Sequence, residues 1–99
     1  MPTLQEVKLS LRLSINDFDL EVRGLIDAAR LDLIQAGVSA EKANLDTDPL
    51  INRAIITYCK ANFGYDNPEA ERFQRSYEML KQHLALASDY KEVSTDETQ

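Results

Sequence analysis

The chain has 99 residues, of which 43% are hydrophobic, and its formal net charge at pH 7 is −6. This length supports one domain with a single core and excludes a deep catalytic cleft with its own lid. The acidic balance, with no run of lysine and arginine, excludes a protein that grips nucleic-acid phosphates.

The first predicted element is a short helix that begins near Thr3 and ends near Leu13. Thr3 and Glu6 have the spacing of a capping box, in which each side chain satisfies the backbone N–H of the other residue. The apolar residues on one side of this helix are Leu4, Val7 and Leu11.

A second helix is expected to follow a cap at Asn16 or Asp17 and to run to about Ala36. Gly37 can take the left-handed conformation that closes a helix. No internal repeat interrupts this segment.

This second helix is apolar on two opposed faces. Its main stripe is Phe18, Val22, Leu25, Ala29, Leu33 and Ala36. Leu20, Leu31 and Ile34 fall on the opposite side. Such a helix is either sandwiched within its own fold or shared between chains, and a four-helix domain offers few layers to sandwich it. We therefore expect these three residues to lie in a subunit interface.

The connection over residues 37–47 is long for a helical bundle, and Ser39 can cap a helical turn within it. Asp48 and Pro49 then form an N-cap and first-turn pair, which starts a third helix that ends at Phe63. Gly64 can close it.

The last helix is expected to begin with Asn67 and Pro68, which repeat the same starting device. Few residues separate Gly64 from this cap, so the third and last helices are expected to form an antiparallel hairpin. No segment shows the sustained alternation of a strand. The predicted fold is all-α, a small bundle of about four helices.

Two apolar lines run along the last helix. The core line is Ala70, Phe73, Tyr77, Leu80, Leu84 and Ala87. The second line is Met79, His83, Leu86 and Tyr90. At about 100° per residue, it lies roughly 110° around the helix from the first line, too far to share one partner surface. Its members either widen the core contact or extend the subunit interface, and we expect the interface.

The end of the chain is disproportionately acidic. Residues 89–99 contain four acids and one lysine. The sequence EVSTDETQ cannot bury enough apolar area to offset the entropy of ordering. We therefore predict a helical domain over residues 1–90 and a flexible acidic tail over residues 91–99.

The residues that carry catalytic or metal-binding chemistry are sparse. His83 is the single histidine and Cys59 the single cysteine, so neither a zinc cluster nor a Cys-His pair is indicated. Cys59 is expected to be a small buried hydrophobe. From Asp17, the sixth and twelfth positions hold Val22 and Ala28 in place of the glycine and glutamate of a calcium loop. No catalytic residue, cofactor site or metal site is predicted.

The lysines and arginines of the last two predicted helices are expected to form a solvated face or to pair with acids on a neighbouring chain. They are Arg53, Lys60, Arg72, Arg75 and Lys81. A single cysteine excludes an internal disulfide, and no apolar run approaches the roughly 20 residues of a membrane span. The amino-terminal MPTLQEVKLS lacks the features of a signal peptide, so we expect synthesis in the cytoplasm and no membrane contact.

Three blocks carry a resemblance over nearly the whole folded part. They are LQEVKLSLRL, NDFDLEVRGLIDAARLDLIQAG and DPLINRAIITYCKANFGYDNPEAERFQRSYEMLKQHLALA. In order and approximate length they resemble the head-tail connector, or adaptor, proteins of tailed bacteriophages and related prophages. The last block is the most specific and the first is generic.

The resemblance implies a helical subunit that forms a homo-oligomeric ring on the portal protein at the capsid vertex and seats the next connector or tail component. DNA would pass through the ring without specific binding, because an acidic wall repels phosphate. The protein would be made in the bacterial host cytoplasm and would end in the virion, at the head-tail neck. A ring needs a heterologous interface, which agrees with the two-faced helices.

Two other functional classes remain open at this point. One is a small cytoplasmic helical regulatory or protein-binding module, which could be dimeric, and a stable dimer indifferent to portal would support it. The other is an enzyme, which a pocket with converging titratable groups would support.

Overall fold

Five helices make up the described part of the chain. The computed structural model describes residues 2–13, 16–64, 67–87 and 89–91. The helices are α1 (Pro2–Ser10), α2 (Asp19–Ala36), α3 (Ala40–Ala43), α4 (Pro49–Asn62) and α5 (Ala70–Leu86). The predicted all-α bundle is thus confirmed, with α3 as the helical turn that Ser39 caps. In the described segments the β-structure is one isolated bridge between Val38 and Lys91.

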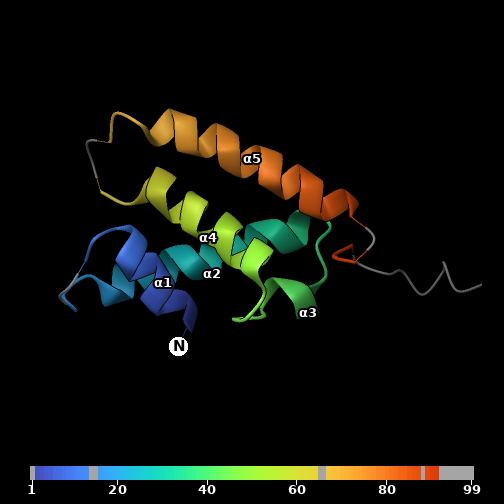
Figure 1. Cartoon of the computed structure of the whole chain (residues 1–99), viewed down its shortest axis with the longest axis horizontal. Helices are drawn as coiled ribbons and strands as arrows, with labels where there is room; N and C mark the ends of the chain where they lie inside the picture. Colours follow the sequence, from blue (N-terminus) through green and yellow to red (C-terminus); the bar gives the residue numbers. More distant parts are fainter. Residues whose placement is uncertain (1, 14–15, 65–66, 88, 92–99) are drawn as a thin grey trace, which may run out of the picture.

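Helix α4 is the centre of the bundle. It packs against α5, α2 and α1, and α2 in turn contacts α1, α3 and α5. Figure 1 shows α5 running alongside α4, as the predicted hairpin requires, with α1 across the other side of α4. The predicted acidic tail over residues 91–99 lies outside the described residues except for Lys91.

The caps of α3 and α4 agree with their sequence signals. The Asp48 carboxylate accepts hydrogen bonds from the backbone N–H groups of Leu50 (3.0 Å) and Ile51 (3.1 Å), and Pro49 follows in the first turn. The Ser39 hydroxyl accepts a bond from the backbone N–H of Lys42 at 3.2 Å. These contacts satisfy N–H groups that have no partner inside the helix.

Gly37 closes α2 as predicted, whereas α4 ends at Asn62 with Phe63, in an extended conformation, as its C-cap. Gly37 has φ +118° and ends α2, with its backbone N–H bonded to the last carbonyls of that helix. Gly64 has φ +85° and follows α4. Both conformations are left-handed and disfavour residues that carry a Cβ.

The capping box predicted for Thr3 is wrong. Helix α1 already begins at Pro2, and Thr3 is fully buried inside it. The Thr3 hydroxyl lies 3.0 Å from the side-chain oxygens of both Asp46 and Asn52, and it accepts a bond from Arg30 at 3.1 Å. A hydroxyl with such partners is a tertiary anchor, because its bonding capacity is used by groups far along the chain.

Helix α1 also ends at Ser10, earlier than the predicted Leu13. The chain turns at Arg12, whose φ of +61° is left-handed, and the backbone N–H of Leu13 bonds to the carbonyl of Lys8 at 2.9 Å. This 6→1 bond is a helix-closing pattern in which Arg12 takes the place that glycine usually holds.

The predicted caps of α2 and α5 need correction as well. Helix α2 begins at Asp19 after Phe18, without a side-chain cap. The side-chain oxygen of Asn16 instead accepts a bond from the Lys8 ammonium at 2.6 Å, which removes it from the helix terminus. Helix α5 begins at Ala70, and Asn67 caps the preceding turn by accepting the backbone N–H of Glu69 at 3.0 Å.

One apolar core joins the helices. Its fully buried members include Val7, Val22, Ile26, Ala29, Leu33, Ile51, Ala54, Ile55, Cys59 and Tyr77. Tyr77 reaches across to α2, where its hydroxyl donates a 2.6 Å hydrogen bond to Asp32. Lys81 lies 3.0 Å from the same Asp32 oxygen and 3.0 Å from Glu78. The expectation that Lys81 belongs to a solvated face is therefore wrong, because two carboxylates hold it against the bundle.

Acidification is expected to lower the free energy of unfolding below about pH 4. Burial alone would raise the pKa of Asp32, but hydrogen bonds from Tyr77 and Lys81 and the charge of Lys81 hold that pKa below its ordinary value of 3.8. A carboxylate with a lowered pKa stabilises the fold above its unfolded-state pKa, and this contribution disappears as the pH falls through the folded-state pKa.

Urea denaturation from about pH 5 to pH 2 measures this dependence. The wild-type chain should lose stability more steeply than Asp32→Asn, which lacks this titrating group. Equal slopes for the two proteins would mean that the Tyr77 and Lys81 contacts do not favour the charged carboxylate.

Candidate subunit interface

The outer face of α2 carries exposed leucines. The side of α2 that faces the core places Val22, Ile26, Ala29 and Leu33 inside. On the opposite side, Leu20 is 86% exposed and Leu31 is 59% exposed. Ile34, which the sequence placed with them, is half-buried against the core. The periodicity thus gave the direction of Leu20 and Leu31 correctly, and the subunit itself does not cover them.

On α5 the second apolar line is exposed along most of its length. Met79 is 72% exposed, Leu86 is 79% exposed, and His83 is also exposed. Tyr90 differs, because α5 ends at Leu86 and the helical spacing no longer places this residue. Its ring packs against the core, and its hydroxyl donates a 3.1 Å hydrogen bond to Asp48.

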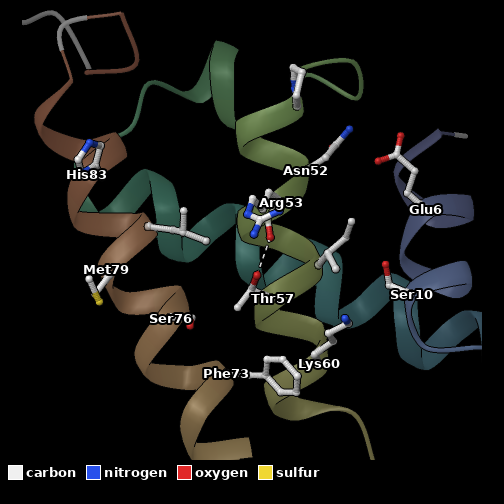
Figure 2. A pocket seen from close by; sticks show the side chains of 13 residues that line it. Glu6, Ser10, Asn52, Arg53, Thr57, Lys60, Phe73, Ser76, Met79 and His83 are labelled. Atoms are coloured by element: carbon white, nitrogen blue, oxygen red, sulfur yellow. Dashed lines mark hydrogen bonds between the residues drawn. The ribbon is translucent and has the colours of Figure 1, made fainter.

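A groove of about 790 Å³ crosses the face that α1, α4 and α5 share. Figure 2 shows α4 as its floor between α5 and α1, with Arg53, Thr57 and Lys60 on the floor and Met79 and His83 on α5. We call it the α4 groove. Its apolar lining consists of Pro49, Ile56, Phe73, Met79 and Leu80. Two residues of the predicted interface, Met79 and His83, thus lie in one surface with residues of another helix.

The charge of the α4 groove opposes that of the chain. The groove is lined by two basic residues of α4, Arg53 and Lys60, and by one acid, Glu6 of α1. The Lys60 ammonium lies 5.4 Å from the centre of the Phe73 ring, a distance at which the ring face attracts a cation. Among the described residues, no ion pair involves Arg53 or Lys60.

These basic groove residues were expected to be solvent-facing or to pair with a neighbouring chain, and no pattern in the sequence joined them to Phe73 and Glu6. Leu9 and Leu50 are further exposed apolar residues, and they lie outside the stripes predicted from the sequence. On the surface, Arg72 pairs with Glu69, just before α5, and Arg75 pairs with Glu71 of the same helix.

The described residues offer little for catalysis. Burial raises the pKa of the Cys59 thiol to about 12, which keeps it protonated and inert at neutral pH. Cys59 is fully buried, as predicted. No group of three or more metal-ligating side chains occurs in the described part of the chain. The groove is large enough for a small ligand, and His83 is the one histidine among the residues that line it.

The described helices include none that combines the length and the apolar character needed to cross a bilayer. Residues 3–91 match a family model with the description phage connector protein. No curated protein and no solved structure gives a significant match to the chain.

Proposed function

The chain belongs to the phage connector protein family, and we propose that its copies assemble into a ring on the portal protein at the capsid vertex. The ring would seat the next connector or tail component in the neck of the virion and let the DNA pass through its centre. The family assigns a structural role in a phage particle, and no enzymatic step enters the proposal.

The exposure of four large apolar side chains on two helices carries this proposal. Leu20 and Leu31 on α2 and Met79 and Leu86 on α5 remain largely uncovered in the isolated subunit. Covering them on a neighbouring copy would bury apolar area at about 25 cal/mol per Å². Exposed apolar side chains that gather into one patch commonly mark protein–protein surfaces.

The proposed interface consists of Leu20, Leu31, Ile34, Met79, His83, Leu86 and Tyr90. The half-buried Ile34 and Tyr90 would lie at the edges of this interface, because one side of each side chain already packs against the core of its own subunit. The exposed members would supply the contact between copies, since the subunit leaves most of their surface uncovered.

The net charge of −6 supports the proposed passage of DNA. A wall that repels phosphate would let the duplex move without adhering, because tight binding to DNA depends on clustered basic groups that release counterions. The basic groups of the α4 groove would then face neighbouring protein rather than the channel.

Size-exclusion chromatography with light scattering, performed alone and with the portal protein of the same phage, tests the proposal. The wild-type chain is expected to form a ring by itself or on the portal. Leu31→Ser and Met79→Ser should keep the circular dichroism of the wild type and lose this assembly. Glu71→Ser is the matched control, because Glu71 is exposed on α5 and lies outside both apolar surfaces.

Two results would contradict the proposal. Normal assembly by both apolar variants would overturn the proposed interface. A stable wild-type dimer that ignores the portal would overturn the ring and support a regulatory or binding module instead.

A further inference from the structure

The residues of α2 that point away from the core include a glycine near the middle of the helix. Leu20, Gly24, Asp27 and Leu31 follow one another at spacings of three and four, so they share one line on the side away from the core. We call this line the α2 ridge. All four residues are exposed.

Gly24 is not explained by the packing of its own subunit. Glycine is among the least favourable residues for a helix interior. Nothing lies within 4 Å of the position that a Cβ would occupy at Gly24, so no neighbour in the subunit requires its absence. A partner that packs closely against the backbone of α2 between Leu20 and Leu31 would require a residue without a Cβ at position 24.

The α4 groove has features that fit such a partner. Its apolar lining can cover leucine side chains, while Arg53 and Lys60 can face the acidic Asp27 of the ridge. Oppositely charged surfaces favour encounter in one register and disfavour like-charged partners.

The ridge and the groove lie on different sides of the subunit. The buried side of α4 carries Ile51, Ile55 and Cys59, and this side meets the core that α4 shares with α2. The groove is on the other side of α4, and Figure 2 shows α2 behind α4 when the groove faces the viewer. A copy whose ridge is occupied therefore keeps its groove free for another copy.

We propose that the α2 ridge of one copy docks in the α4 groove of the next copy. This assignment rests on the proposed ring and names the two surfaces that meet in it. Because the surfaces differ, the contact is heterologous and repeats from copy to copy, as closure of a ring requires. Leu20 and Leu31 lie against the apolar lining, and Gly24 allows the groove walls to approach the helix backbone.

Cross-linking between two cysteine variants tests the docking. Gln35→Cys places a thiol on the outer side of α2, one turn beyond Leu31, and Ser76→Cys places one in the α4 groove. Neither change removes an apolar anchor. The native Cys59 does not interfere, because it is fully buried and its thiol has a raised pKa of about 12.

The two variants are mixed under the conditions in which the wild-type chain assembles, with the portal if it is needed, and treated with a short bismaleimide. The mixture is expected to give several-fold more cross-linked dimer than either variant alone. Glu71→Cys replaces Ser76→Cys in the matched control, since it is exposed on the same helix outside the groove, and it should give only background.

The outcomes separate the two proposals. Assembly without a cross-link specific to the mixture overturns the docking and leaves the ring intact. A cross-link in Gln35→Cys alone shows ridge against ridge and also overturns the docking. The absence of any assembly, alone or with portal, contradicts the ring and the docking together.

Substitution at Gly24 gives an independent readout. Gly24→Ala and Gly24→Phe should both fold, because the space beside Gly24 is open in the subunit. Thermal unfolding should show no loss of stability for Gly24→Ala. Gly24→Phe should reduce the assembled fraction at least several-fold, and undiminished assembly of this variant would overturn close docking at the ridge.

Discussion

Replacing Leu33 by alanine is expected to lower the free energy of unfolding by about 3 kcal/mol. Leu33 is fully buried between α2 and the rest of the core. The substitution removes buried apolar area and leaves a cavity that a close-packed interior closes only in part. In a domain of this size such a loss is a large part of the total stability.

Leu31→Ala is the matched control for this prediction. It lies two residues away on the same helix and is 59% exposed, so its effect on stability should stay within about 0.5 kcal/mol. Urea denaturation of both variants, monitored by circular dichroism, gives the two values. Similar losses for Leu31→Ala and Leu33→Ala would contradict the inward and outward faces assigned to α2.

The second large effect is expected for Arg30→Met, which should cost about 2 kcal/mol. The Arg30 guanidinium donates a 2.6 Å hydrogen bond to Asp46 and a 3.1 Å bond to Thr3. Methionine keeps most of the apolar stem but leaves the Asp46 carboxylate without its cation. Because the Asp46 side chain is 33% exposed, water recovers part of the loss, which keeps the cost below that of a fully buried pair.

Arg72→Met provides the comparison for Arg30→Met. Arg72 pairs with Glu69 on the surface, where both side chains are more than half exposed, so its removal should cost between about 0 and 0.5 kcal/mol. Equilibrium unfolding of the two variants at about 0.15 M salt decides the point. A cost for Arg30→Met no greater than for Arg72→Met would mean that the cluster around Thr3 does not hold α1 in place.

Local signals in the sequence were sufficient for part of the fold. The bonds of Asp48 and Ser39 reach only two or three residues along the chain, and Gly37 acts through its own backbone dihedral. Helical spacing likewise separated the buried Val22, Ala29 and Leu33 of α2 from its exposed Leu20 and Leu31, because successive residues of a helix are about 100° apart. These features depend on residues that are close together in the chain, so the sequence alone is enough to predict them.

The failures concern partners far along the chain. Thr3 had the spacing of a cap, but its hydroxyl bonds to residues 43 and 49 positions away. Lys81 had the character of a surface lysine, but Asp32 lies 49 positions away. Tyr90 was placed by extending a helix that ends at Leu86. Nothing in local spacing reports such tertiary contacts.

The candidate interface shows the same division. Periodicity identified Leu20, Leu31, Met79 and Leu86 as surplus apolar residues, and each is exposed. The α4 groove was not foreseen, because it combines residues of α1, α4 and α5 that share no common period. A surface made by one helix can be predicted from its spacing, whereas a surface made by three requires their packing.

The anchoring of α1 through Thr3 has a consequence for the order in which the chain folds. Nine residues are too few to persist as an isolated helix in water. Thr3 gains its partners Arg30, Asp46 and Asn52 only once α2 and the start of α4 have come together. Bringing Thr3 to these distant partners before they are assembled would cost loop-closure entropy that no formed contact offsets. We therefore expect the amino-terminal segment to dock last during refolding and to fray first when the native state opens.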